Sequence, residues 1–297
     1  MLRGILAGIA AGALWGLVFV APRMAAGYSS VDLTAGRFVV YGLIAAAVML
    51  LGLRSRRLPT WRQAGSAVIM SVLGFTGYYL LLVLAIRDAG TEVPTLIIGT
   101  IPIWVMLLGK PKQLHWRALI PGLALTLGGL ALMMAYQPAD TSGVFAAWWW
   151  RGIAFAIASL VCWTAFAILN SAWLKRHPEV NATDWANWLG VATGIGALML
   201  WALAGTPLGE MAGREGLALF ILLCVGTGFG SAWLATILWN IASRRLSASL
   251  CGQLIVSETL FALLYSFAWD GRWPGVAQAA ACLLFTMGIL ASIKAHR

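Results

Sequence analysis

The chain has 297 residues, of which 61% are hydrophobic and only 10% are charged, and its mean hydropathy is +0.86. Soluble domains carry about 25% charged residues, so this composition excludes an ordinary soluble protein and predicts an integral membrane protein. In a soluble chain the net charge of +10 would suggest a nucleic-acid partner. Here most positive charges lie at the ends of apolar runs, so we expect the lipid bilayer as a partner and no nucleic acid.

Hydropathy along the chain predicts ten membrane-spanning helices, since a helix needs about 20 apolar residues to cross a bilayer. Their connections are short, so we expect one compact bundle without a soluble domain. The connecting loop 137–147 divides the chain into two units of five spans, 1–136 and 148–297. The predicted spans are 4–22, 32–53, 63–86, 92–109, 117–136, 148–174, 183–205, 215–241, 246–268 and 274–293.

The first span carries a regular series of glycines. Gly4, Gly8, Gly12 and Gly16 recur every four residues, which places them on nearly one face of a helix. Small residues at this spacing let a second helix approach closely. The apolar run is also longer than the ~7–15 residues of a signal-peptide core. We therefore interpret it as a packed membrane helix rather than a cleaved signal.

Polar side chains occur inside the second and third spans. Arg37 lies about a turn and a half inside the second span, where it can extend to the membrane surface or pair with Glu92 or Asp32. Binding of a substrate carboxylate by Arg37 is the alternative interpretation. Tyr78 and Tyr79 follow a pair of glycines in the third span, and we expect both to line a cavity because a buried hydroxyl needs a polar partner.

The fourth span, VPTLIIGTIPIWVMLLG, is apolar but interrupted. Pro102 has no N–H for the preceding turn and its ring crowds the carbonyl four residues back, so the helix should break near Ile98. In lipid an unpaired carbonyl is costly, so the break must face protein or water. Interrupted spans are the best sequence indication of a transporter's substrate site. We therefore expect Thr95, Gly99, Thr100 and Pro102 to form one wall of a central cavity.

Further candidates lie in the sixth and ninth spans. Glu258 is near the centre of the ninth span, where a charge costs roughly 2.5–3.5 kcal/mol on insertion scales, and no Lys or Arg is expected at the same depth. We expect Glu258 to bind a substrate amino group or to exchange a proton; the alternative is a neutral acid hydrogen-bonded inside the protein. Trp163, Asn170 and Gln253 complete the predicted cavity lining. Internal packing is the alternative for this tryptophan and for the two tyrosines of the third span. A hydroxyl bonded back to its own helix is the alternative for the threonines of the fourth span.

Few residues are available for catalysis or metal binding. The cysteines all fall inside apolar runs and the histidines all lie in polar connections, so they form neither a metal-ligand spacing nor a disulfide framework. We therefore expect no metal, no cofactor and no enzymatic activity. These residues are Cys162, Cys224, Cys251, Cys282, His115, His177 and His296.

The positive charges indicate the orientation of the chain. Fourteen Lys and Arg residues lie at one set of span ends and five at the opposite set. Because cytoplasmic loops carry the excess of Lys and Arg, both termini should be cytoplasmic, which agrees with an even number of spans.

The two five-span units repeat one another. Trp15 in the first span corresponds to Trp163 in the sixth, and the segment 74–78 of the third span corresponds to 226–230 of the eighth. With an odd number of spans in each unit, the second unit enters the membrane from the opposite side, so the repeats are inverted. The predicted fold is an all-α membrane protein with ten transmembrane helices, arranged as two inverted five-helix repeats around a central cavity. Since both repeats are in one chain, we expect a monomer.

A mid-span tryptophan in the first helix of each half, a glycine-rich third helix and a broken fourth helix resemble the EamA family of the drug/metabolite transporter superfamily. Within it the sequence is most similar to the YddG-type amino-acid and metabolite exporters. The resemblance implies ten helices, both termini inside, and export of small organic solutes across the bacterial inner membrane. The chain departs from many relatives at Ser257, the second-half counterpart of Pro102, and at Asp270, which occupies the place of a later glutamate.

We therefore expect an exporter of small molecules, with metabolites such as amino acids, including aromatic ones, as substrates, that works by alternating access. The lack of a base at the depth of Glu258 argues against anionic cargo such as sugar phosphates. A multidrug or cation exporter that uses Glu258 as its proton or cation site is the alternative within the superfamily. A non-transport membrane scaffold is the alternative of a different class, and proton-coupled and facilitated transport both remain open.

Overall fold

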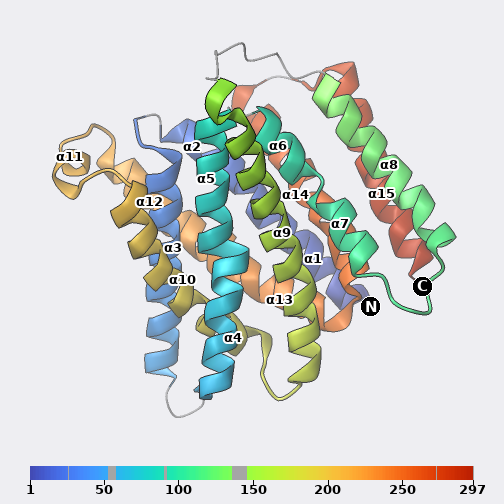
Figure 1. Cartoon of the computed structure of the whole chain (residues 1–297), viewed down its shortest axis with the longest axis horizontal. Coiled ribbons are helices and arrows are strands. Elements are labelled where there is room, and N and C mark those ends of the chain that lie inside the picture. The colour runs from blue at the N-terminus through green and yellow to red at the C-terminus, as the bar shows by residue number, and fades with distance from the viewer. Residues whose placement is uncertain (26, 53–57, 90–91, 136–145, 272, 297) are drawn as a thin grey trace.

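The structure is a computed structural model of the chain, and it describes residues 1–25, 27–52, 58–89, 92–135, 146–271 and 273–296. All regular secondary structure within these ranges is helical (Figure 1). The predicted connecting loop 137–147 lies almost entirely outside them. The α-helices are α1 (Leu2–Gly16), α2 (Ala21–Met24), α3 (Ser30–Leu51), α4 (Trp61–Ser71), α5 (Gly77–Ala89), α6 (Glu92–Gly99), α7 (Ile101–Leu108), α8 (Trp116–Ala135), α9 (Ala146–Arg176), α10 (Ala182–Ala204), α11 (Leu208–Ala212), α12 (Leu217–Thr227), α13 (Ala235–Arg245), α14 (Ala248–Asp270) and α15 (Val276–Ala295).

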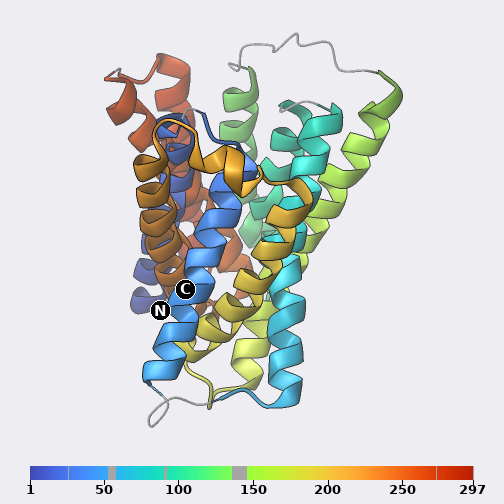
Figure 2. The ribbon, with the colours of Figure 1, turned by 90° about the vertical axis from the view of Figure 1, so that its left-hand side faces the viewer.

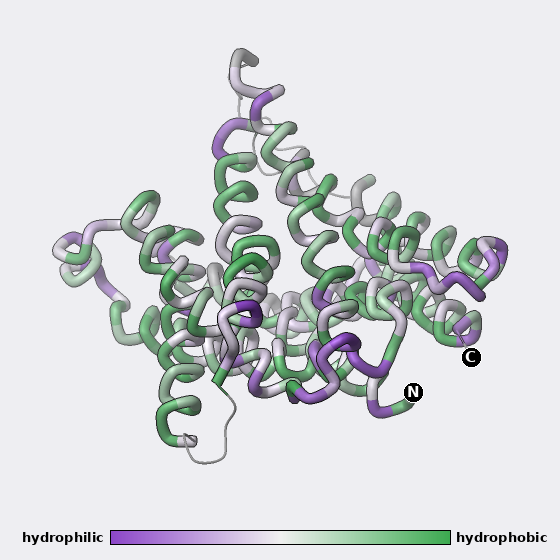
Figure 3. Tube along the Cα trace, turned by 60° about the horizontal axis from the view of Figure 1, so that its bottom comes forward, coloured by the Kyte–Doolittle hydropathy of each residue, from purple (hydrophilic) through white to green (hydrophobic). Residues whose placement is uncertain are grey.

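The apolar helices match the predicted spans in position. In the described part of the chain seven helices are long and apolar enough to cross a bilayer, and they coincide with the second, third and sixth to tenth predicted spans. Shorter apolar helices at Leu2–Gly16, Ile97–Leu108 and Trp116–Leu132 coincide with the first, fourth and fifth. Figure 3 shows hydrophobic residues along the helices and hydrophilic residues concentrated at helix ends and connections. The structure confirms an all-helical membrane protein, and the count of ten stays a prediction.

The glycine face of α1 packs against α13 and α14, as the four-residue spacing predicts. A Cβ at Gly8 would lie 2.7 Å from the side chain of Leu254, and one at Gly16 would lie 2.9 Å from the backbone of α14. Gly4 and Gly12 make similarly close approaches to the same two helices. The interpretation of this segment as a packed helix is therefore confirmed.

The predicted break in the fourth span is also confirmed. Helix α6 ends at Gly99 and α7 begins at Ile101, with Pro102 in the first turn of α7, where its missing N–H has no intrahelical role. Thr100 connects the two helices, and its hydroxyl donates to the Ile97 carbonyl over 2.6 Å. In the second half α14 continues without a break through the corresponding residue, so the two halves differ at this point.

The third span of each half contains a π-helical segment. Val72–Thr76 separates α4 from α5, and Gly228–Leu234 separates α12 from α13. Both segments overlap the glycine-rich sequences 74–78 and 226–230, from which the repeat was predicted. Single π-helical turns inside α-helices are uncommon and occur frequently at functional sites. Their presence in both third spans makes these spans candidates for a functional role.

Most of the extensive helix contacts join the first half of the chain to the second. Helix α3 packs on α10, α8 on α15, α5 on α9 and α7 on α14, while α1 packs on both α13 and α14. Figure 1 shows α8 and α15 side by side, and Figures 1 and 2 show both termini close together on one side of the molecule. Each five-span unit is therefore covered by the other, and the two form one bundle.

Gly42 of α3 and Gly194 of α10 meet where these helices cross, and a Cβ at Gly194 would lie 2.8 Å from the Gly42 Cα. Because backbone atoms cannot move aside, Gly194→Ala should lower the free energy of unfolding by about 1–3 kcal/mol, the usual cost of overpacking. Thermal unfolding in detergent measures this change. Gly226→Ala is the matched control, since a Cβ there meets no atom within 4 Å. Equal melting temperatures for the two variants would contradict the close crossing.

Candidate functional site

Burial along α14 changes abruptly at Glu258. The nine residues from Ser249 to Ser257 are all buried, whereas none of the residues from Glu258 to Trp269 is buried. Helix α14 begins beside the N-terminal end of α1, where Gly4 approaches the α13–α14 turn. The packed half of α14 therefore lies toward the termini, and its more exposed half lies away from them.

Neighbouring helices change in burial along their length in the same way. Toward the termini, Val105 of α7, Leu250 and Leu254 of α14 belong to one buried apolar cluster. Toward the opposite end, every residue of α5 from 77 to 84 and of α6 from 97 to 99 is partly exposed. We interpret this pattern as a hollow that is closed on the side of the termini and open on the other side, which the labelling experiment below tests.

Glu258 lies close to Arg37 of α3 in this hollow. The two side chains interact electrostatically with each other and with Tyr78 of α5. They form no ion pair within 4.0 Å, and the Glu258 carboxylate accepts no hydrogen bond from the described residues. The neighbouring Ser257 hydroxyl donates to the Leu254 carbonyl instead. The Nε atom of Arg37 is buried without a hydrogen-bond partner.

This placement of Arg37 corrects two expectations from the sequence. The depth of Glu258 does contain a base, and Arg37 does not pair with Asp32. The side chain of Glu92, the other acid considered for Arg37, lies outside those described. The Asp32 carboxylate accepts hydrogen bonds from Ser29 and from the Thr206 hydroxyl, each over 2.7 Å. A position along a span gives the depth of the backbone, whereas a long arginine side chain carries its charge to a different level. The sequence feature that could have indicated this placement is an arginine inside an apolar run.

Aromatic side chains form a second part of the hollow. The mid-span tryptophans of the two repeats, Trp15 and Trp163, meet with ring centroids 6.4 Å apart in an edge-to-face arrangement. Trp239 of α13, which the sequence did not single out, packs within 5.3 Å of Trp15 and 6.1 Å of Trp163. Trp15, Trp163 and Tyr78 are partly exposed, whereas Trp239 is buried. We call Arg37, Tyr78, Trp15, Trp163 and Glu258 the central site.

Three other predicted residues are also partly exposed. Tyr79 follows Tyr78 on α5, and its hydroxyl is within hydrogen-bonding reach of the Thr34 side chain. Gly99 and Thr100 are partly exposed at the α6–α7 break. The Thr100 hydroxyl bonds back to its own helix, which is the alternative considered for it from the sequence.

The remaining predicted residues do not face the hollow in this conformation. Pro102 is buried. Asn170 is completely buried; it donates to Asn240 over 3.1 Å and accepts from the indole of Trp185 over 2.7 Å. Gln253 is also completely buried and donates to a hydroxyl of α8 over 2.9 Å. The side chain of Thr95 lies outside those described. Polar residues inside a span have the same sequence pattern whether they contact a ligand or one another. Only the burial of each side chain in the structure distinguishes the two cases in this conformation.

The side chains that could ligate a metal ion are scattered in the part of the chain that the structure describes. Among the described residues, no group of three or more His, Cys, Asp or Glu side chains is placed to hold a metal ion. The central site can instead offer a carboxylate, a guanidinium, a phenol and two indoles, which are groups that bind a small polar molecule by hydrogen bonds and ring contacts.

Comparison with known proteins identifies the family. A family model described as the EamA-like transporter family matches residues 2–135. The inner membrane protein YtfF of Escherichia coli (strain K12) is 30% identical over 310 residues, which cover 99% of this chain and 96% of YtfF. This chain belongs to the EamA-like transporter family. A solved crystal structure matches with a TM-score of 0.77 over 98% of both chains at 21% identity, which supports the fold alone.

Family membership indicates the kind of protein to which the central site belongs. The chain is a membrane transporter, and its apolar helices together with its similarity to an inner membrane protein make it a multi-pass protein of the inner membrane. The resemblance found from the tryptophans, the glycine-rich third helix and the broken fourth helix is confirmed. The central site is therefore the candidate substrate site of an EamA-like transporter.

The hollow can be tested by cysteine labelling in a variant whose four native cysteines are replaced by serine. Glu258→Cys should react with a membrane-impermeant thiol reagent added from the side opposite the termini, because this position is partly exposed. Ser257→Cys is the matched control, since Ser257 is only 2% exposed and should stay unlabelled. Mass spectrometry of the intact protein measures the modification. Equal labelling at both positions would contradict the abrupt change in burial.

Proposed function

We propose that this transporter exports small zwitterionic or neutral metabolites, in particular amino acids with aromatic side chains, by alternating access. The observation that carries the proposal is the pair of opposite charges at the central site. Arg37 and Glu258 lie close together without a direct ion pair, and neither forms an ion pair with another described residue. Both charges are thus free to bind parts of one ligand.

A zwitterion matches this pair of charges. An α-ammonium group can donate to the Glu258 carboxylate while the α-carboxylate accepts from the Arg37 guanidinium, and such charge-assisted hydrogen bonds are the strong ones. A charge inside a membrane protein is costly unless it is paired or hydrated. A bound zwitterion compensates both charges at once and brings no net charge, which favours it over an anion or a cation.

The aromatic part of the central site favours an apolar or aromatic substrate side chain. Trp15 and Trp163 are partly exposed around the buried Trp239, and Tyr78 packs against the same cluster. Aromatic pairs in edge-to-face or offset arrangements add about 0.5–1.5 kcal/mol beyond the area that they bury. A ring on the substrate would therefore find suitable neighbours beside the charged groups.

Alternating access is supported by the way the two halves pack. Helix α1 packs on the spans of α13 and α14, and α9 packs on the spans of α5, α6 and α7, which is the relation expected when α1 and α9 are equivalent helices of two repeats. Helices α3 and α10 pair with each other, as do α8 and α15. Inverted repeats of this kind support rocking of one unit against the other around a midplane site.

The cation exporter considered from the sequence remains the second candidate, because the Glu258 carboxylate is unpaired. Arg37 argues against it, since a second positive charge at the site would repel a cationic cargo. A zwitterion avoids this repulsion because its own carboxylate lies between the two cations. The presence of Arg37 therefore makes the zwitterion the better fit.

Efflux from proteoliposomes tests the proposal with three related solutes. Phenylalanine carries both charges, phenethylamine lacks the carboxylate, and 3-phenylpropionate lacks the ammonium. The wild-type protein should prefer phenylalanine over both analogues. Glu258→Gln and Arg37→Gln should each lower phenylalanine efflux about tenfold or more at subsaturating concentration, because a hydrogen bond to a charged group contributes about 1.5–3 kcal/mol.

Glu210→Gln is the matched control for the charge change, since Glu210 is exposed on α11 and pairs with Arg214. Its efflux should equal that of the wild type. Phenethylamine efflux that exceeds phenylalanine efflux and depends on Glu258 but not on Arg37 would favour the cation exporter. Wild-type rates in both central-site variants would overturn the proposed substrate site.

A further inference from the structure

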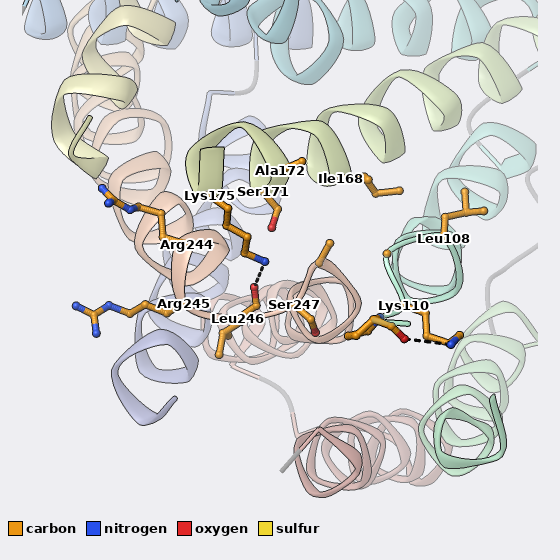
Figure 4. A pocket seen from close by; sticks show the side chains of 13 residues that line it. Leu108, Lys110, Ile168, Ser171, Ala172, Lys175, Arg244, Arg245, Leu246 and Ser247 are labelled. Carbon is orange, nitrogen blue, oxygen red and sulfur yellow. Dashed lines mark hydrogen bonds between the residues drawn. The ribbon is translucent and has the colours of Figure 1, made fainter. Parts of the chain in front are cut away.

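A pocket of about 540 Å³ lies at the end of the bundle that carries both termini. It is formed by the ends of α7 and α9 and by the turn between α13 and α14 (Figure 4). The buried apolar cluster around Val105, Leu250 and Leu254 separates it from the central site. The pocket is therefore distinct from the candidate substrate site.

All of the charge that lines this pocket is positive. Lys110, Lys175, Arg244 and Arg245 contribute to its wall, and none of its lining residues is acidic. None of the ion pairs formed by described residues involves these four side chains. A pocket of one sign of charge with low-dielectric walls concentrates its field and attracts a counter-ion.

Carbonyl oxygens hold three of these cations in place. Arg244 donates to the carbonyls of Val180 and Pro178. Lys175 points toward the turn between α13 and α14 and donates to the Leu246 carbonyl over 2.6 Å (Figure 4). Lys110, on the opposite wall, donates to the Leu114 carbonyl over 2.5 Å. Arg245 lies at the rim, is exposed, and forms no hydrogen bond with a described residue. A carbonyl orients an ammonium group but does not neutralise it, so the pocket keeps its positive charge.

The first turn of α14 adds to the positive potential. Ser247 caps this 23-residue helix by accepting from the Leu250 N–H over 3.1 Å, and Ser247 and Ala248 both line the pocket. The Ser249 N–H is used by the Gly109 carbonyl over 3.1 Å. These N–H groups are therefore already bonded, and this end of α14 adds the positive potential of its dipole rather than free donors.

The pocket also has an apolar side that reaches the outer surface of the bundle. Leu108 is 64% exposed, and Ile168 is partly exposed beside it. In a multi-pass membrane protein such surface contacts lipid chains. The ligand that suits the whole site has an anionic head and an apolar tail, whereas a soluble anion would leave the apolar side unused.

We propose that this pocket binds the phosphate group of an anionic phospholipid, with Lys175 as its principal cationic contact and the acyl chains along Leu108. The exposed Arg245 points away from Lys175 in Figure 4 and is a second contact at the rim. Basic pockets between membrane helices on the cytoplasmic side are suited to acidic head groups. The bound lipid connects the end of α9 to the α13–α14 turn, at the packed end of the hollow. The site does not depend on which solute the protein transports.

Lipid titration of the purified, delipidated full chain in neutral detergent tests this site. Phosphatidylglycerol should raise the melting temperature, whereas phosphatidylcholine with the same chains should not. Lys175→Gln combined with Arg245→Gln should raise about 30-fold the phosphatidylglycerol concentration that gives half of the increase in melting temperature. The reason is that each basic residue near a head group contributes about fivefold to the affinity for the lipid. Arg62→Gln combined with Lys294→Gln is the control, since it removes two exposed cations outside the pocket.

Arg245→Gln alone is the second variant, because Arg245 forms no hydrogen bond with a described residue and its loss leaves the fold intact. It should weaken the lipid response about fivefold. An equal response in the pocket variants and the control would overturn the proposal, as would an equal effect of phosphatidylcholine. Saturation of the effect by inorganic phosphate or glycerol phosphate alone would assign the pocket to a soluble anion instead.

Discussion

The rest of the structure depends on one constraint, which is that two opposite charges lie deep in an apolar bundle. They are a guanidinium and a carboxylate, and no direct bond joins them. Each charge is costly in a membrane interior unless water, protein or ligand compensates it. Arg37 and Glu258 come from α3 and α14, which belong to different halves of the chain. The bundle must therefore keep an accessible space at this point while it packs tightly elsewhere.

Tight packing around that space comes from small residues. The glycines of α1 bring its backbone against α14, and the pair Gly42 and Gly194 does the same for α3 and α10. In a membrane, helix association relies on such close contact because lipid chains are as apolar as the side chains themselves. The same close contacts set the positions of Arg37 and Glu258, since each lies on a helix fixed by a glycine contact.

The features that the sequence predicted correctly depend on local chemistry. Hydropathy locates the helices, Pro102 breaks the fourth span, and a four-residue glycine period identifies a packing face whatever the partner helix is. The contacts of polar residues could not be predicted where the partner lies far away in the sequence. Asn170 contacts Asn240 and Trp185, and no pattern within its own span could show that. The position of the Arg37 charge depends on a side-chain conformation, which hydropathy does not describe.

The packed helices α7 and α14 differ in continuity, since α6 and α7 are separated at Thr100 while α14 continues without a break past Ser257. In a protein made of identical inverted repeats, the states open to either side would be related by a two-fold rotation and would have equal free energy. With one interrupted and one intact helix the two states differ in free energy, because bending at Thr100 and tilting of α14 require different free energies. Under the proposed alternating access, this asymmetry would give the transporter a preferred resting side even in the absence of a solute gradient.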